Sequence, residues 1–216
     1  CIIDVGGNIG YSAYYYSNYI LKTNGICFSF EPMSNNLFYH NYNTKKIKNL
    51  FTVPFGISKK TEELILDIPE YALKQGDLRS SNTGLISSNN LSTPTKYREK
   101  RLLIKLDDFM RLFDNLNNNI KYIKVDVEGS ELNVLSGAMS IIKNHKPIIQ
   151  IEYNDLFISK EKLFQIISEI ESNDFIAYSD KKQNSKFERC EIFFIPSNML
   201  NLYNKDLFNN LFFKIN

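Results

Sequence analysis

Short apolar runs alternate with amphipathic segments along most of this chain, and this alternation limits the fold more than any other feature. The apolar runs have strand length and lie at residues 1–5, 26–30, 50–54, 120–127 and 147–153. The segments between them carry the helical i, i+3, i+4, i+7 period, seen most clearly in Leu163, Ile166, Ile167 and Ile170. Strands that alternate with helices predict a doubly wound α/β fold, in which a mostly parallel sheet has helices on both faces.

Polar residues with capping side chains predict where several helices begin. These candidate caps are Ser34, Asp107 or Asp108, Ser130 and Ser159. We expect the first helix at residues 11–22 and the second to end near residue 45. The helix after Ser130 has a single apolar face made of Leu132, Leu135, Met139 and Ile142. The spacing thus predicts one continuous helix there.

The middle and the end of the chain depart from the alternation. Residues 62–68 and 102–106 read as strands, and residues 175–178 and 191–195 as a terminal pair of strands. Residues 79–95 are rich in Ser, Asn and Thr, which is typical of a mobile lid or of simple disorder. We favour a mobile substrate loop over residues 69–98. The tail, residues 198–216, keeps a spaced apolar pattern that predicts a short docked helix.

Length and composition describe one globular domain over residues 1–216. The net charge of +2 does not predict the clustered basic surface that nucleic-acid binding needs. No apolar run reaches the roughly 18 residues of a membrane span. The three cysteines form no CxxC pair, which favours buried free thiols and a reducing, cytoplasmic location. The chain opens without Met and inside a strand, so we expect that an N-terminal portion is missing.

The turn at residues 4–10 has the composition of a ligand-binding loop, although a βα turn that merely contains glycines is the simpler alternative. Glycines there let a ligand approach the main chain, and the helix beyond offers free N–H groups. Glu31 closes the second strand, where an acid in a doubly wound fold can accept both hydroxyls of a ribose. These residues together predict a cofactor site made of Asp4, Gly6, Gly7, Asn8, Gly10 and Glu31.

The spacing of these glycines bears on the identity of the cofactor. It is not the GxGxxG spacing that a pyrophosphate requires, since Asn8 stands where that pattern has glycine. S-adenosylmethionine has no phosphate, and Asp4 suits its ammonium group, through the loop or through a water. The sequence therefore favours S-adenosylmethionine, and a nucleotide-dependent oxidoreductase of the NAD type is the first alternative.

Acidic side chains also end two later strands. Asp126 and Glu128 alternate with Val127, so both point to one side, and Glu152 closes the next strand. Because ligands in such sheets bind beyond the carboxyl ends of the strands, these acids should open onto one crevice. Two acids placed in this way can serve as a general base, as a clamp on hydroxyls or as a metal pair.

Each of these acids also has a structural alternative. For Asp126 it is an ion pair with a neighbouring lysine, and for Glu128 it is a role in capping or in the turn. For Glu131, in the first helical turn, we prefer plain stabilisation of the helix. No histidine joins the group, because His40 lies in a helix and His145 in a polar loop, so we expect no metal site.

Four segments of the chain, in the order DVGGNIG, FEP, IKVDVEGSELNVLSGA and PIIQIEY, resemble the FkbM family of S-adenosylmethionine-dependent methyltransferases. The resemblance spans residues 1–155. It implies a class I methyltransferase (Rossmann-like) fold with seven strands, the last antiparallel, and contacts of Gly6, Asn8 and Glu31 with the cofactor. It also implies methyl transfer to oxygen, frequently on a sugar hydroxyl of a glycan or natural product. Gly7 stands where the family often has alanine, which we take as a harmless departure.

Methyl transfer to an alcohol gives the acidic residues specific roles. A base within hydrogen-bond reach of the hydroxyl is expected to help, and Asp126 is the first candidate and Glu152 the second. Glu128 and Tyr153 are candidate contacts to a small-molecule or glycan acceptor. A non-catalytic module that only binds the cofactor is a further alternative. The retained acids argue against it, because unused acids in a crevice cost free energy of desolvation.

Overall fold

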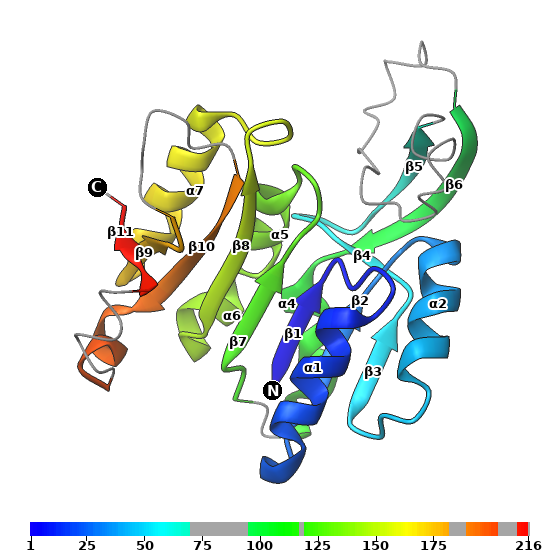
Figure 1. Cartoon of the computed structure of the whole chain (residues 1–216), viewed down its shortest axis with the longest axis horizontal. Helices are drawn as coiled ribbons and strands as arrows, with labels where there is room; N and C mark the ends of the chain where they lie inside the picture. The colour runs from blue at the N-terminus through cyan, green and yellow to red at the C-terminus, as the bar shows by residue number, and fades with distance from the viewer. Residues whose placement is uncertain (70–94, 117–118, 182–188, 203–210, 216) are drawn as a thin grey trace.

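A mostly parallel sheet forms the centre of the molecule, in a computed structural model that describes residues 1–69, 95–116, 119–181, 189–202 and 211–215 (Figure 1). Its strands are β1 (Ile2–Val5), β2 (Cys27–Phe30), β3 (Leu50–Val53), β7 (Tyr122–Val125), β8 (Ile148–Asn154), β9 (Phe175–Ser179), β10 (Arg189–Pro196) and β11 (Phe213–Lys214). Their order is β11-β9-β10-β8-β7-β1-β2-β3. The pairs from β3 to β8 are all parallel, whereas β10 runs antiparallel to both β8 and β9. The predicted α/β fold with a late antiparallel strand is confirmed, and the short β11 adds an eighth strand to the seven expected.

Helices cover both faces of this sheet, as the alternation predicts. They are α1 (Tyr11–Ile20), α2 (Ser34–Thr44), α4 (Leu106–Met110), α5 (Glu131–Gly137), α6 (Met139–His145) and α7 (Lys160–Glu171), with 3-10 turns η1 (Leu21–Thr23), η2 (Arg111–Leu116) and η3 (Ser197–Leu202). Figure 1 shows α1 in front of the sheet and α5, α6 and α7 behind it. The predicted cap of α7 is confirmed, since the Ser159 hydroxyl accepts a hydrogen bond from the N–H of Lys162.

Three expectations about helix ends are wrong. The helix after Ser130 is not continuous, because it breaks at Ala138 into α5 and α6. Asp107 does not cap its own helix; its two carboxylate oxygens accept the N–H groups of Ser140 and Ile141 at the start of α6, each at 3.0 Å. The predicted cap Ser34 is the first residue of α2 and makes no capping bond with its side chain.

The two faces of the sheet differ in polarity. One row across paired strands is apolar, made of Ile3, Ile123, Ile149 and Phe194, and all four side chains are fully buried. The next row is polar, made of Ser29, Asp4, Lys124 and Gln150. Because side chains alternate along a strand, the rows point to opposite faces. The apolar face holds the main core, and the polar face contributes to the site.

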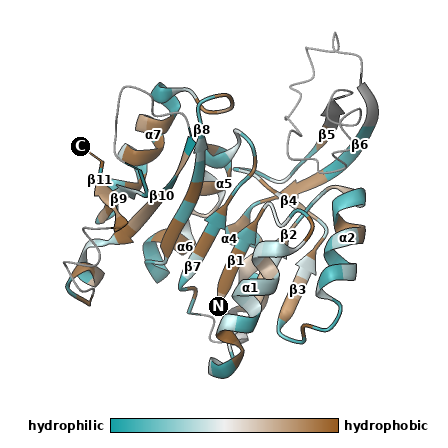
Figure 2. Ribbon diagram, viewed as in Figure 1, coloured by the Kyte–Doolittle hydropathy of each residue, from teal (hydrophilic) through white to brown (hydrophobic). Residues whose placement is uncertain are grey.

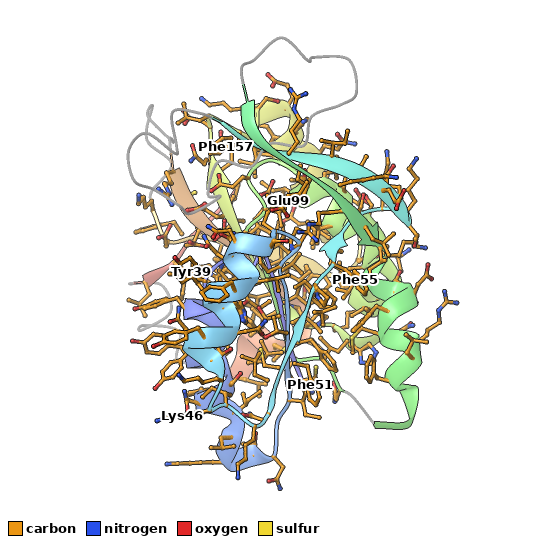
Figure 3. The ribbon with its side chains drawn as sticks, turned by 90° about the vertical axis from the view of Figure 1, so that its right-hand side faces the viewer. Tyr39, Lys46, Phe51, Phe55, Glu99 and Phe157 are labelled. Carbon is orange, nitrogen blue, oxygen red and sulfur yellow. The ribbon has the colours of Figure 1, made fainter. Side chains whose placement is uncertain are left out.

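A second, three-stranded sheet stands beside the carboxyl end of the main one. Its strands are β4 (Gly56–Ile57), β5 (Glu62–Pro69) and β6 (Thr95–Ile104), in the order β4-β6-β5, with β5 and β6 antiparallel. The predicted strand at 62–68 is confirmed, whereas the one at 102–106 is wrong in its bounds, because Leu106 begins α4. Figure 3 shows Glu99 of this sheet above the start of α2, where its carboxylate accepts the N–H of Ser34 at 3.0 Å.

Some predictions concern segments that lie partly outside the described residues. The proposed loop at 69–98 lies mostly outside the described residues, and at its borders the structure has strand up to Pro69 and from Thr95. The predicted helix in the tail lies mostly outside the described residues; the described part contains η3, a helical residue at Leu211 and β11. Cys27 and Cys190 are buried free thiols as predicted, and Cys1 is free and partly exposed. No helix in the described ranges has the length and apolar character to cross a membrane.

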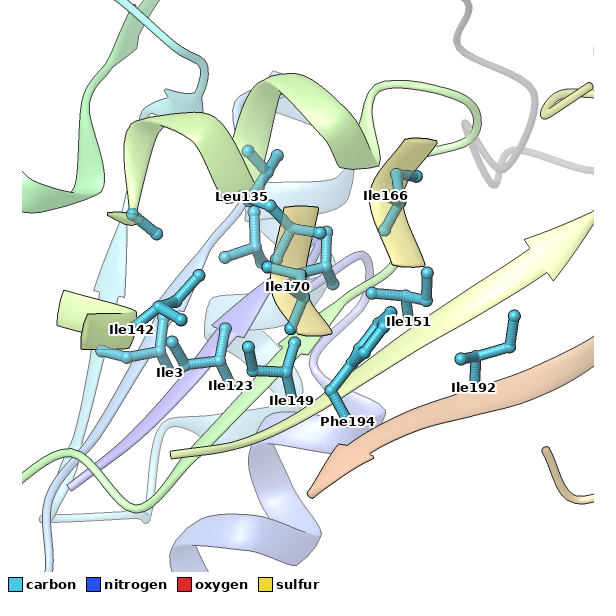
Figure 4. Packing of buried hydrophobic residues seen from close by; sticks show 14 of the residues in the cluster. Ile3, Ile123, Leu135, Ile142, Ile149, Ile151, Ile166, Ile170, Ile192 and Phe194 are labelled. Atoms are coloured by element: carbon cyan, nitrogen blue, oxygen red, sulfur yellow. The ribbon is translucent and has the colours of Figure 1, made fainter. Parts of the chain in front are cut away.

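The apolar face of the sheet packs against the helices behind it. Figure 4 shows isoleucines of β1, β7 and β8 facing α5, α6 and α7, whose contributions are Leu135, Ile142, Ile166 and Ile170. These side chains are at most 1% exposed. Fully burying one aliphatic side chain of this size contributes about 2 kcal/mol of stability. This core fixes the strand ends at which the polar residues gather.

Candidate functional site

A cavity of about 260 Å³ lies at the carboxyl ends of β1, β2, β7 and β8. Its residues come from separate parts of the chain: the turn after β1, the end of β2 and the start of α2, the strand ends of β7 and β8, the second sheet, and the start of β10. Ligands in doubly wound folds bind at this end of the sheet. The lining includes Glu31 and the glycine turn, and it also includes the cluster of Asp126, Glu128 and Glu152, which we call the acidic end.

Gly6 begins the turn after β1 and lets two strand ends meet. Its φ is +86°, and a Cβ placed there would lie 1.9 Å from the carbonyl oxygen of Asp126. No side chain fits at that distance, so only glycine allows β1 and β7 to close this side of the cavity. The N–H groups of Gly6 and Gly7 both donate to the carbonyl of Phe30, at 3.0 and 2.9 Å, which holds the turn against β2.

Glu31 lies where β2 ends, and it is only 4% exposed. Its Oε2 accepts the N–H of Asn8 at 2.9 Å, and its Oε1 accepts the N–H of Met33 at 2.8 Å. Burial raises the pKa of Glu31 to about 7, although these N–H groups favour the carboxylate. The structure therefore places Glu31 beside the predicted turn and within the cavity, as the sequence predicts.

The six predicted cofactor residues separate into two groups. Gly6, Asn8 and Glu31 line the cavity, which are the three that the family resemblance singled out. Asp4, Gly7 and Gly10 are not among its lining residues. Asp4 is fully buried, accepts a hydrogen bond from Ser29 at 2.9 Å, and has its pKa raised by burial. It therefore supports the turn from beneath.

The acidic end of the cavity brings together residues that lie far apart in the sequence. Ligand oxygens of Asp126, Glu128 and Glu152 all lie within 4.8 Å of one another. Lys124 Nζ is 2.9 Å from Asp126 Oδ2, and Arg189 Nε donates to Glu152 Oε1 at 2.7 Å. Two of the three carboxylates are thus paired with cations. The structural alternative for Asp126, an ion pair with a neighbouring lysine, is realised within the cavity itself.

Glu128 is the carboxylate of this group for which the described residues show no cation partner. Its Oε2 is buried and has no hydrogen-bond partner in the described part of the chain. Burial, and after it the charges of Asp126 and Glu152, raises the pKa of Glu128 to about 8. Its φ of +53° is rare for a residue with a side chain. A strained, partly buried acid of this kind at a cavity wall is typical of functional sites.

Two other candidates do not reach the cavity. Glu131 is 2% exposed and its Oε1 accepts the N–H groups of Val127 and Gly129, so it stabilises the turn before α5, close to the structural role that we preferred. Tyr153 is fully buried in the core, on the opposite face of β8 from Glu152, and does not line the cavity. The structure therefore gives Tyr153 no direct place beside a substrate.

Several cavity residues escape prediction from the sequence. The second sheet supplies an apolar wall through Ile57, Leu66 and Leu103, each at most 5% exposed. Arg189 arrives from β10, which pairs antiparallel with β8. The alternation of Lys124 with Asp126 along one strand is a usable signal, because side chains two apart share a face. For the apolar wall there is no local signal, since it depends on long-range pairing.

The chemistry of the lining suits a ligand with a polar end and an apolar part. A carboxylate has about four acceptor positions, so Glu31 can hold ribose hydroxyls in addition to its backbone partners. Asn8 Oδ1 is buried at the cavity without a partner in the described residues, which leaves an acceptor for a ligand. The three clustered acids have the spacing of a divalent-cation site. Because Lys124 and Arg189 already balance two of them, the need for a metal is small.

Comparison with known proteins identifies one matching family and solved structures of similar fold. Residues 4–178 match the family model described as "Methyltransferase FkbM domain". The fold resembles the crystal structure of Methyltransferase FkbM from Methylobacillus flagellatus KT, with a TM-score of 0.55 and 20% identity over 89% of this chain and 42% of that one. It also resembles Aeropyrum pernix fibrillarin in complex with natively bound S-adenosyl-L-methionine, with a TM-score of 0.50 and 9% identity over 90% of this chain and 65% of that one.

At these identities the two structures show a shared fold and nothing finer. This chain spans 42% of the Methylobacillus protein and just under two thirds of the fibrillarin chain, 65%. No curated protein matches the sequence.

Proposed function

This chain belongs to the FkbM methyltransferase family, and from that premise we propose that it methylates a hydroxyl oxygen of a sugar, glycan or other natural product. S-adenosylmethionine is the methyl donor of the enzymes in this family. When bound, it supplies a methyl group on a sulfonium sulfur, which is already an activated electrophile. The protein must then hold the cofactor, place the acceptor oxygen and take up its proton.

The cofactor end of the cavity supports this proposal. Glu31 offers a carboxylate for the ribose hydroxyls, and Gly6 and Asn8 present the turn beside it. The apolar wall of Ile57, Leu66 and Leu103 offers a surface for the adenine base. The glycine spacing does not provide the close approach that a pyrophosphate needs, so the NAD-type alternative is disfavoured.

The acidic end supplies candidates for the work on the acceptor. Asp126 is our first candidate for the group that accepts or orients the hydroxyl proton, and Glu152 is the second. Burial and the neighbouring charge of Asp126 raise the pKa of Glu152, which makes it a better proton acceptor than an ordinary glutamate. Glu128, whose raised pKa favours the protonated form, can donate a hydrogen bond to a second oxygen of the acceptor.

The single observation that carries the proposal is that one cavity contains both ends. Glu31 and the turn line it together with Asp126, Glu128 and Glu152, so a cofactor and an acceptor can meet within one space. A non-catalytic binding module would not need the second group. Three carboxylates held so close repel one another, and this repulsion is a cost that binding of a cofactor alone does not require.

Transfer of labelled methyl groups tests the proposal. The whole chain is incubated with S-adenosylmethionine labelled on its methyl carbon and with a panel of glycans and hydroxylated natural products. We expect label on oxygen in an acceptor of this class. Replacing Asp126 by Asn should lower turnover by roughly 10²–10⁴-fold, the usual contribution of a general base, while S-adenosylhomocysteine still binds.

The matched control for this substitution is Asp155→Asn. Asp155 is an exposed acid just beyond β8 and lies outside the cavity lining. It should keep full turnover. Full turnover in Asp126→Asn with intact cofactor binding would move the role of base to Glu152, and full turnover in Glu152→Gln as well would overturn the carboxylate mechanism. Label on nitrogen alone would contradict the proposed acceptor class.

A further inference from the structure

The buried face of α2 is polar where a helix against a sheet is usually apolar. Its inward residues are Asn36, His40 and Thr44, one turn apart, and they are 2%, 0% and 5% exposed. Figure 2 shows this helix as largely hydrophilic. An amphipathic helix normally turns its apolar stripe inward, and burying polar groups costs free energy unless they are hydrogen-bonded. The hydrogen-bond partners of these three residues therefore indicate the role of the buried polar face of α2.

His40 joins two strands of the sheet to each other. Its Nε2 lies 3.0 Å from the hydroxyl of Ser29 on β2, and its Nδ1 lies 3.1 Å from the hydroxyl of Thr52 on β3. Ser29 in turn donates to Asp4 Oδ2 on β1 at 2.9 Å. The result is one continuous chain of hydrogen bonds, Thr52–His40–Ser29–Asp4, which crosses three neighbouring strands.

The direction of each bond in this chain can be assigned. The single hydroxyl proton of Ser29 is used on Asp4, so Ser29 must accept from His40, and Nε2 carries the ring proton. Nδ1 is then the acceptor for Thr52. This arrangement needs a neutral ring, and burial lowers the pKa of His40 to about 4, so the ring is neutral at pH 7. Every group in the chain has one defined role.

The glycine turn packs directly against the hydrogen-bonded side chains of Ser29 and His40. A Cβ added to Gly7 would lie 2.2 Å from Ser29 Oγ and 3.0 Å from His40 Nε2. The backbone at Gly7 therefore sits as close to the two side chains as it can. An alanine at Gly7 would not fit in this protein unless Ser29 or the turn moved.

The N-terminal end of the same polar face of α2 contacts Glu31, the carboxylate that we propose binds the ribose. Asn36 lines the cavity and its side chain is hydrogen-bonded to Glu31. Glu31 holds the N–H of Asn8, which is the far side of the turn. The inward face of α2 thus contacts the turn from below, through His40, and contacts the acid beside it, through Asn36. Both parts of the cofactor end depend on one helix.

We propose that the buried chain Thr52–His40–Ser29–Asp4 fixes the glycine turn in the shape that binds the cofactor, and that His40 is a positioning residue for cofactor affinity. The proposal rests on the proposed function, since it takes the turn as the cofactor site. His40 does not touch the cavity; it acts through Gly7 and Ser29. A positioning role of this kind affects binding of the product S-adenosylhomocysteine, which can be measured without an acceptor.

The test compares His40→Leu with His40→Gln by calorimetric titration of S-adenosylhomocysteine. Leucine keeps the bulk and removes both hydrogen bonds, whereas glutamine can place a donor near the position of Nε2. We expect His40→Leu to raise Kd by about tenfold or more, and His40→Gln to return it to within about threefold of the parent protein. Amide hydrogen exchange of residues 6–10 should be faster in His40→Leu. Asn41→Ala, an exposed change on the same helix, is the control and should alter neither quantity.

The possible results separate this proposal from the proposed function. If the parent chain does not bind S-adenosylhomocysteine, the proposed function fails and this inference fails with it. If the parent binds and folded His40→Leu binds equally well, with only a lower Tm, then His40 is merely structural and the inference alone is overturned. Should His40→Leu not unfold cooperatively, Thr52→Val decides, because it removes only the bond to Nδ1. An unchanged Kd in Thr52→Val would then count against the inference.

Discussion

At the scale of single residues, Glu31 has two tasks that compete for the same oxygens. Without a ligand its carboxylate accepts the N–H groups of Asn8 and Met33, and it is almost wholly buried. A ribose must use the remaining acceptor positions, and protonation of the carboxylate replaces one of them by an O–H donor. Since burial raises the pKa of Glu31 to about 7, its charge changes within the range of pH in which the protein can be studied.

This leads to a prediction about pH. Affinity for S-adenosylhomocysteine should be full above pH 7 and should fall as pH drops through that value, because protonation removes an acceptor from Glu31. Calorimetric titrations from pH 5.5 to 8.5 measure it. The variant Glu31→Gln cannot titrate at this position and should show weaker binding without the step near pH 7. An equal dependence on pH in both proteins would mean that another group is responsible.

Glu128 allows a prediction about stability. Its φ of +53° carries strain that glycine would relieve, by about 1 kcal/mol. Its pKa of about 8 lies above the ordinary 4.5, so between these values the folded protein holds a proton that the unfolded chain has lost. Stability contributed by this group therefore falls as pH rises from 4.5 to 8. Glu128→Gly should be more stable in urea unfolding, and its advantage should widen over that range.

Asp174 provides the matched control for Glu128. It also has a positive φ, +61°, but its side chain is 87% exposed. Asp174→Gly should gain from relief of strain, less the small contribution of the exposed ion pair that Asp174 makes with Lys146. If the advantage of Glu128→Gly does not widen as pH rises, the charge of Glu128 is not a burden in the folded state. The loss of a candidate acceptor contact in Glu128→Gly is expected to lower turnover despite the gain in stability.

At this scale a site residue could be predicted only where the neighbouring sequence indicates its role. Gly6, Asn8 and Glu31 follow strand ends at a recognisable spacing, and all three line the cavity. His40 gives no such signal, because a histidine within a helix is usually structural and its partners come from other strands. The sequence predicts an acceptor contact for Tyr153, but Tyr153 is adjacent to Glu152 on β8, and adjacent residues of a strand face opposite sides.

At the scale of elements, the α5–α6 break shows how a helix end can be set from elsewhere. The apolar period continues through Ala138, so the sequence predicts no interruption. The carboxylate of Asp107, on α4, accepts the first free N–H groups of α6 and so provides a cap for a helix that begins there. The break is therefore stabilised by a residue about thirty positions earlier, which no local pattern reveals.

The neighbouring acids Asp107 and Asp108 form a natural pair for a test of this cap. Asp107→Ala should lower the free energy of unfolding by about 1 kcal/mol, the usual value of a helix cap. Asp108 makes a surface ion pair with Arg111 and its side chain is 40% exposed, so Asp108→Ala should change stability by less than about 0.5 kcal/mol. Equal effects of the two substitutions in chemical denaturation would contradict the assignment of the cap.

The second sheet marks the limit of what local patterns can predict. The strand character of residues 62–68 is visible in the sequence, but its partners are not. Pairing of β5 with β6, and of β4 with β6, removes these strands from the main sheet and sets Leu66 and Leu103 against the cavity. The choice of sheet depends on contacts between distant residues, and these are not encoded in a period of two.

At the scale of the whole molecule, the two faces of the main sheet have different roles. The apolar row and the helices α5, α6 and α7 supply the core, while the polar row carries Ser29, Asp4 and Lys124 toward the site. The alternation of strands and helices predicts this architecture because it requires only local patterns and short connections. On the second face, Ser29 and Asp4 lie beneath the turn and Lys124 is paired with Asp126 of the cavity, whereas Gln150 bonds to Tyr16, Tyr122 and Glu191 outside the cavity lining.

The central claim is that the cavity between Glu31 and the turn after β1 binds S-adenosylmethionine. A thermal shift of the whole chain with S-adenosylhomocysteine and with NAD tests it most directly, because a ligand that binds only the folded state raises Tm. Glu31→Gln serves as the variant, and Glu161→Gln, an exposed glutamate on α7, as its control. We predict that S-adenosylhomocysteine raises Tm in the parent and in Glu161→Gln, that the shift is lost or much reduced in Glu31→Gln, and that NAD has no effect. A shift with NAD alone, or an undiminished shift in Glu31→Gln, would contradict the claim.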